Sequence, residues 1–155
     1  MPRTAFHLRW FLVALWVWLI YALSGPEFAG AKTDPAIENQ LRTAAPQLDR
    51  REVRQATYYL RKHAHVAVYA TLALLLAWAL SGGFPPRRPT LRTAALVLLA
   101  VGGIAALDEW HQTLVPGRFG RATDVVIDLA GASLAVGLLA LVGRRHRPPP
   151  APAKP

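Results

Sequence analysis

The sequence predicts an all-α integral membrane protein, a bundle of four transmembrane helices with short amphipathic helices in the first outer loop. Hydrophobic residues make up 53% of the 155 residues and charged residues only 17%, a balance that favours a membrane protein over a soluble one. The hydrophobic residues are also gathered in long stretches with few or no charges. About 20 such residues in a helix cross the roughly 30 Å hydrocarbon core of a bilayer.

The first predicted transmembrane helix covers residues 10–23. This stretch also fits the apolar region of a cleaved signal peptide, with Ala22-Leu23-Ser24 as an imperfect cleavage site. We favour a retained helix, because Phe6 and Leu8 extend the apolar stretch beyond Arg9. The content of Trp and Tyr also suits an anchor at the membrane interface.

Three further windows predict the remaining transmembrane helices: residues 66–86, 93–107 and 125–143. The second of these is short, but Thr90 and Leu91 extend it if the long side chain of Arg92 reaches back to the headgroups. The third is interrupted only by Asp128. Four crossings place both termini on the same side of the membrane.

The distribution of charges predicts that this side is cytoplasmic. All nine acidic residues fall in or next to segments 24–64 and 108–128, which we therefore place outside. The other segments carry only basic charges, as cytoplasmic loops do, and the short turn with Arg87 and Arg88 weighs most. We expect a multi-pass cell-membrane protein with cytoplasmic termini.

The composition also bounds the partners. The net charge of +9 suits a leaflet rich in anionic lipid, so the lipid bilayer is the first expected partner. No zinc knuckle, RNA-binding signature or helix-turn-helix pattern is present, and no nucleic-acid partner is predicted. The absence of cysteine excludes disulfides and thiolate metal sites. Residues 1–147 are assigned to the transmembrane domain, and the proline-rich residues 148–155 to a disordered cytoplasmic tail.

Residues 25–62 form the long outer loop and contain two helix signals. Asp34 is predicted to cap a first short amphipathic helix, with Pro35 at its first position. A second is predicted to start at Asp49, with Glu52 completing a capping box, and to run towards the membrane. Such helices either lie in the membrane interface or cover a binding site as a lid.

The stretch LDEWHQTLVPGRFGRATDVVIDLAG gathers ionisable residues between two apolar windows. On a helix, Asp108, His111 and Gln112 share one face, whereas Glu109 and Trp110 point elsewhere. The Pro-Gly pair in the middle predicts a type II turn. The chain is therefore expected to bring its later polar residues back over the first three.

Asp128 is the most informative residue of the stretch. It follows Asp124 by one turn and lies about 7 Å inside the helix end at 1.5 Å per residue. A carboxylate at that depth normally faces the bundle interior and has a partner. Gly131, one turn further in, is predicted to allow close packing of the third and fourth transmembrane helices. The candidate partners of the two carboxylates are basic side chains of the loop and of the second transmembrane helix: Arg118, Arg121, His63 and His65.

These residues predict an outward-facing binding site contributed by the second, third and fourth transmembrane helices. Its predicted members are Asp108, Glu109, His111, Gln112, Arg118, Asp124, Asp128 and His65.

Two motifs, RKHAHVAVYATLAL at 61–74 and DEWHQTLVPGRFGRATDVVIDLAGA at 108–132, together with Ser24-Gly25, resemble the VanZ-like membrane proteins. The resemblance covers about residues 10–143. It implies four transmembrane helices in a bacterial cell-envelope protein. The founding member of the family is associated with reduced susceptibility to the glycopeptide teicoplanin, which makes a role in such resistance an expectation for this chain. One difference is Asp128, where the family pattern commonly has Asn.

Three functions remain open from the sequence. The first, which we favour, is a protein that binds or masks a cell-envelope component, such as a lipid-linked peptidoglycan precursor or a glycopeptide, with Arg118 and Arg121 placed for phosphate or carboxylate. The second is an intramembrane enzyme acting on a lipid-linked substrate. The third is a proton or ion path through Asp124 and Asp128, which the lack of an inverted repeat disfavours.

The enzyme hypothesis lacks an assigned catalytic residue. A divalent metal could be bound by carboxylate and imidazole groups, or His111 could act as a general base oriented by Asp108. No nucleophile motif such as G-x-S-x-G and no zinc-protease motif is present. No cofactor is predicted, and the sequence leaves a metal undecided. The candidate metal ligands are Asp108, Glu109, His111 and Asp124.

Overall fold

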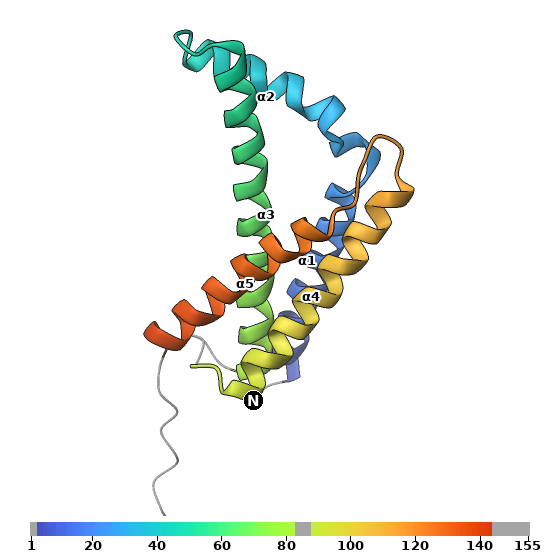
Figure 1. Cartoon of the computed structure of the whole chain (residues 1–155). Coiled ribbons are helices and arrows are strands. Elements are labelled where there is room, and N and C mark those ends of the chain that lie inside the picture. Colours follow the sequence, from blue (N-terminus) through green and yellow to red (C-terminus); the bar gives the residue numbers. More distant parts are fainter. Residues whose placement is uncertain (1–2, 83–87, 144–155) are drawn as a thin grey trace, which may run out of the picture.

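The computed structural model describes residues 3–82 and 88–143. The regular elements of these residues are all helices, with no strand among them. In chain order the elements are α1 (Arg3–Leu23), the 3-10 helix η1 (Pro26–Phe28), α2 (Gly30–Ala44), α3 (Arg50–Ser81), α4 (Leu91–Leu114) and α5 (Ala122–Val142) (Figure 1). Four of them, α1, α3, α4 and α5, are long and apolar enough to cross a membrane. This confirms the predicted all-α bundle of four transmembrane helices. The predicted tail at 148–155 lies outside the described residues.

α3 is the central helix, because it packs against α1, α2, α4 and α5. Figure 1 shows α5 crossing α3 obliquely, while α2 spans the gap between the ends of α1 and α3. The buried core between the helices consists mostly of Ala and β-branched side chains, among them Ala73, Val97, Val101 and Ala132. Such side chains let helices approach closely where lipid replaces water outside.

Gly131 shows how close this approach is. A Cβ atom at this position would lie 2.6 Å from the backbone oxygen of Val66 in α3. The prediction that Gly131 serves close helix packing therefore agrees with the structure, but its partner is α3 rather than the preceding helix α4. Between α4 and α5 the spacing is wider, since a Cβ at Gly102 would meet only the side chain of Leu129, at 3.4 Å.

α3 begins as the sequence predicts. The side chain of Asp49 accepts hydrogen bonds from the backbone of Arg51 and Glu52, and the Glu52 side chain accepts one from the Asp49 backbone. The helix then continues without interruption for 32 residues. The second amphipathic helix predicted for the outer loop is therefore the first part of α3 and no separate element.

α2 differs from the prediction at its start. The helix begins at Gly30, after Ala29 in extended conformation, so Pro35 lies inside it rather than at its first position. Asp34 caps no helix and instead forms an ion pair with Arg61 of α3, 2.8 Å away. This contact ties α2 to α3.

The loop between α4 and α5 contains the predicted turn. Gly117 has φ +80°, a left-handed conformation that suits glycine, and the backbone N–H of Arg118 donates to the carbonyl of Val115 across 3.1 Å. The chain then folds back against α4, so that a Cβ at Gly120 would overlap the carbonyl oxygen of Glu109. α5 consequently starts beside the C-terminal part of α4, as Figure 1 shows.

Candidate functional site

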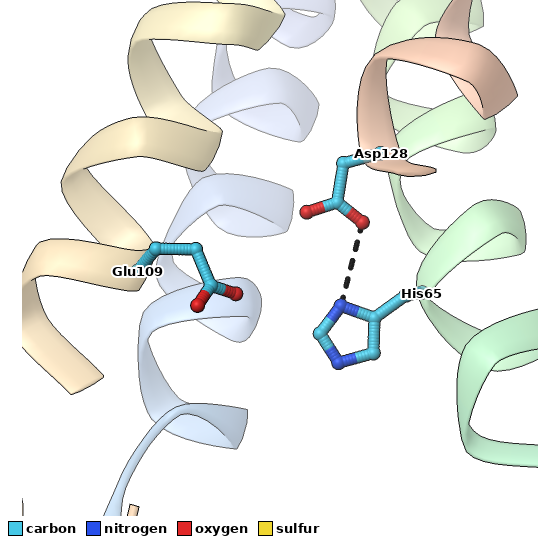
Figure 2. Close-up of side chains that lie close together, drawn as sticks. All are labelled: His65, Glu109 and Asp128. Carbon is cyan, nitrogen blue, oxygen red and sulfur yellow. Dashed lines mark ion pairs between the residues drawn. The ribbon is translucent and has the colours of Figure 1, made fainter. Parts of the chain in front are cut away.

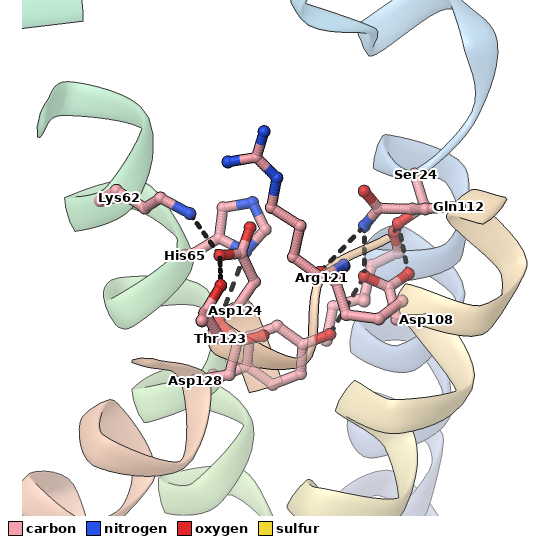
Figure 3. A network of polar contacts seen from close by, with 12 residues as sticks. Ser24, Lys62, His65, Asp108, Gln112, Arg121, Thr123, Asp124 and Asp128 are labelled. Atoms are coloured by element: carbon pink, nitrogen blue, oxygen red, sulfur yellow. Dashed lines mark hydrogen bonds and ion pairs between the residues drawn. The ribbon is translucent and has the colours of Figure 1, made fainter. Parts of the chain in front are cut away.

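Polar side chains are buried together at the end of the bundle that carries α2 and the loop 115–121, which we call the loop end. Figure 3 shows them between α3 and α5 on one side and α1 and α4 on the other. Four carboxylates take part, and each has different surroundings.

Asp108 is buried and receives three hydrogen bonds from neutral groups. The hydroxyl of Ser24, just after α1, donates to Oδ1. The hydroxyl of Tyr69 in α3 and the amide of Gln112 donate to Oδ2, across 3.2 and 3.0 Å. Asp108 therefore joins three helices and has its charge stabilised by donors without a cation.

Glu109 is also buried, with 5% of its surface exposed. Its Oε2 accepts a hydrogen bond of 2.7 Å from the backbone N–H of Arg121, and its Oε1 lies 3.5 Å from the amide of Gln112. The prediction that Glu109 points away from Gln112 is wrong. At about 100° per residue the two side chains are only about 60° apart around the helix, and the returning loop buries that side.

Asp124 and Asp128 find their partners on α3. Lys62 Nζ lies 2.5 Å from Asp124 Oδ1, and His65 Nδ1 lies 3.4 Å from Asp128 Oδ1. Of the candidate partners, His65 is therefore confirmed. The exposed His63 instead contacts the carbonyl of Tyr59 one turn back in α3. The loop arginines pair with neither carboxylate in the described contacts: the side chain of Arg118 donates to backbone carbonyls, and the described contact of Arg121 is made by its backbone N–H.

Arg118 Nη2 donates to the carbonyls of Leu23 and Gly25, across 2.5 and 3.3 Å. It thus provides a donor for the carbonyl of Leu23, the last residue of α1. Burial and the neighbouring positive charge of Arg61 lower the pKa of Arg118 below its usual range.

His111 does not join Asp108 and Gln112 in a common network, contrary to the prediction. Its ring lies against that of Tyr21 in α1, with 4.5 Å between the ring centroids. His111 and Gln112 follow Asp108 by three and four residues, so their side chains lie on opposite sides of the Asp108 side chain around the helix axis. His111 therefore faces α1, whereas Gln112 faces the buried network.

Sequence reasoning missed Tyr69 as a member of the network. Its position one turn after His65 on α3 was the available signal, since residues four apart share a helix face. An aromatic residue in an apolar stretch has no feature of its own that indicates a buried hydroxyl partner.

Two adjoining pockets open beside this network, under α2. The first has a volume of about 250 Å³ and mostly apolar walls, including Ile20, Phe28, Ile37 and Val68, with Asp108 at its polar end. The second has a volume of about 460 Å³ and is lined by five Lys and Arg side chains against three Asp and Glu. Both pockets are lined by Arg61, His65, Gln112 and Arg118.

The model of the VanZ/LLP1 family matches residues 9–143, which is most of the chain and includes every residue of the network. The chain belongs to the VanZ/LLP1 family. No curated protein and no solved structure matches the sequence. Family membership and the four apolar helices together make this a multi-pass membrane protein.

In this VanZ/LLP1 protein one group of side chains has the composition of a metal site. His65, Glu109 and Asp128 each offer a ligand atom, and these atoms lie within 4.8 Å of one another. Figure 2 shows the three side chains reaching towards a common centre from α3, α4 and α5. Of the four metal ligands considered from the sequence, only Glu109 belongs to this group.

Proposed function

We propose that this VanZ-like membrane protein binds an anionic, lipid-linked component of the cell envelope in its two adjoining pockets, and masks it. The observation that carries the proposal is the continuity of an apolar pocket with a basic one through shared residues, above all Arg61 and Arg118. An anionic lipid likewise has an apolar chain joined directly to a negatively charged group. With the loop end facing outward, as the charge pattern predicts, such a molecule would be held on the outer side of the membrane.

The apolar pocket suits a hydrocarbon chain. Its walls come from α1, η1, α2 and α3, and the polar groups at its inner end are already hydrogen-bonded to one another through Asp108. A chain can therefore lie against Asp108 and its three donors without breaking their hydrogen bonds, and burying its surface stabilises the complex.

The basic pocket suits a phosphate. Arg118, with its guanidinium group, lines both pockets. Its Nε atom is buried and has no hydrogen-bond partner among the described residues. Arg121 adds a second guanidinium group. The contact of Arg121 with Glu109 is made by its backbone N–H and not by this group. Guanidinium groups bind phosphate through charge-assisted hydrogen bonds.

Masking connects this binding with the family resemblance. A lipid-linked wall precursor held in the pockets would be withheld from a glycopeptide, which would reduce susceptibility to teicoplanin-type drugs. An intramembrane enzyme acting on the same lipid is the second candidate, and the carboxylate and imidazole groups beside the pockets favour it. Recovery of the ligand unchanged after incubation separates binding from turnover.

Native mass spectrometry of the detergent-purified protein tests the binding. We expect a polyprenyl phosphate to bind more tightly than the uncharged polyprenol and than phosphatidylcholine. Ala64→Leu should weaken binding of the phosphate and of the polyprenol alike, because Ala64 lines the apolar pocket. Arg121→Gln should weaken only the phosphate, because Arg121 lines the basic pocket.

Two matched variants control for general effects. Ala67→Leu adds the same bulk to an exposed position of α3 outside both pockets, and Arg51→Gln removes a charge near the start of that helix. Both should bind as the wild type does. Equal affinity for the phosphate and the polyprenol, or equal losses in test and control variants, would contradict the proposal.

A further inference from the structure

We propose that His65, Glu109 and Asp128 form a binding site for a divalent transition-metal ion, Zn²⁺ or Mn²⁺, in the wall of the two pockets. The inference rests on the arrangement of these three side chains and is independent of the proposed lipid ligand. Imidazole and carboxylate ligands together suit such ions.

The three residues come from three different helices and contribute one ligand atom each, all within 4.8 Å of one another. Two ligand atoms of a tetrahedral ion lie about 3.4 Å apart when each is about 2.1 Å from it. The group therefore has to contract by about 1.4 Å at most, which side-chain rotations provide.

The hydrogen bonding of Asp128 is a second observation in favour of a cation site, beside the arrangement of the three ligand atoms. It is completely buried, and neither of its carboxylate oxygens has a hydrogen-bond partner among the described residues. The Nδ1 atom of His65, which faces it, has no hydrogen-bond partner there either. Buried polar groups are normally satisfied, and a carboxylate inside a membrane bundle normally has a close partner. A bound cation would satisfy both groups.

The other carboxylates of the network show how differently Asp128 is placed. Asp108 has three donors, and Asp124 has the ammonium group of Lys62. Glu109 and Asp128 face one imidazole between them, which at most compensates one of their two charges. A divalent ion would compensate both.

The surroundings of Glu109 are those of an oriented metal ligand. The backbone N–H of Arg121 fixes one of its oxygens, and the amide of Gln112 lies near the other. Such outer hydrogen bonds hold a ligand in its binding orientation. His65 lines both pockets, so an ion can reach the group from the pocket side.

The alternative is a simple ion pair between His65 and Asp128, with no metal. The first test measures metal on protein purified without a histidine tag, stripped with a chelator and dialysed against Zn²⁺ or Mn²⁺. We expect about one equivalent by elemental analysis and a rise in melting temperature that saturates. Asp128→Asn and Glu109→Gln should each weaken binding at least tenfold. Glu27→Gln, a control that removes an exposed carboxylate paired with Lys32, should bind as the wild type does.

The second test looks for a new signal and does not depend on loss of binding. The chain has no cysteine, so His65→Cys introduces the only thiol. With Co²⁺, a thiolate at a ligand position produces a strong charge-transfer absorption. We expect this band for His65→Cys and not for the control His63→Cys, whose position is exposed on the same helix.

A wild-type protein that stays free of metal would overturn the proposal, as would undiminished binding in both carboxylate variants. If those variants fail to fold, the cobalt spectrum decides: no band for His65→Cys, or equal bands at both positions, overturns it. None of these measurements uses a lipid, so failure of the metal site leaves the proposed lipid binding untouched, and the reverse also holds.

Discussion

The hydroxyl of Tyr69 donates a hydrogen bond to Oδ2 of Asp108 across 3.2 Å, and in doing so joins α3 to α4 inside the bundle. Ser24 adds α1 to the same carboxylate. Because its three donors come from three parts of the chain, Asp108 holds these parts together. Asp128 differs from it, because its carboxylate has an ion pair with His65 but accepts no hydrogen bond from the described residues.

Tyr69→Phe removes one of the three hydrogen-bond donors to Asp108 and keeps the aromatic ring. We expect the free energy of unfolding to fall by about 1–3 kcal/mol, because a buried carboxylate loses one of its hydrogen bonds. Thermal or denaturant unfolding in detergent measures the change. The control Tyr59→Phe alters an exposed tyrosine and should change stability little. Equal stability of both variants would mean that the remaining two donors suffice.

The four membrane helices were predictable because length and hydropathy alone define them. The start of α3 was predictable too, since a capping box is a local signal. The start of α2 was not predictable. Asp34 is a residue type that often caps helices, but its carboxylate pairs with Arg61, 27 residues away. A long-range ion pair has no signature in the local sequence.

The site was predictable in its members more than in its pairings. Helical periodicity placed Asp108 and Gln112 together, yet it could not show that the loop returns against Glu109 or that His111 packs on Tyr21. Those contacts depend on which helix lies on each side of α4. Only the packed bundle shows that His65 reaches Asp128 while the loop arginines do not.

The packing of α5 against α3 gives a second prediction. Gly131→Ala should lower the free energy of unfolding by about 1–3 kcal/mol, because the added Cβ would press on the backbone of Val66 and force the two helices apart. The control is Gly137→Ala in the same helix, where a Cβ would have no neighbour within 4 Å. That variant should be as stable as the wild type or slightly more, since alanine favours helix. Similar stability of both variants would show that the helices separate at low cost.

A third prediction concerns the guanidinium of Arg118 at the end of α1. Arg118→Lys keeps the charge but loses the planar fork that reaches the carbonyls of Leu23 and Gly25. We expect a loss of about 1 kcal/mol in unfolding free energy, the usual net contribution of such a hydrogen bond. Arg121→Lys is the control, because the contact of Arg121 with Glu109 uses its backbone N–H. A melting temperature unchanged by Arg118→Lys would place this arginine in ligand binding alone.

The last prediction concerns sidedness, on which the proposed envelope ligand depends. The absence of native cysteine allows single thiols to report it. Phe119 is 79% exposed in the loop that closes the site, and Arg92 is exposed near the start of α4, at the opposite end of that helix. Since the charge pattern places the loop outside, a membrane-impermeant maleimide should label Phe119→Cys in intact cells and Arg92→Cys only after permeabilisation. A thiol buried in lipid reacts slowly with maleimide from either side of the membrane. Both variants must therefore first be shown to react fully in detergent. The reverse pattern would turn the pockets towards the cytoplasm, where a protein could not withhold a precursor from a drug acting outside the cell.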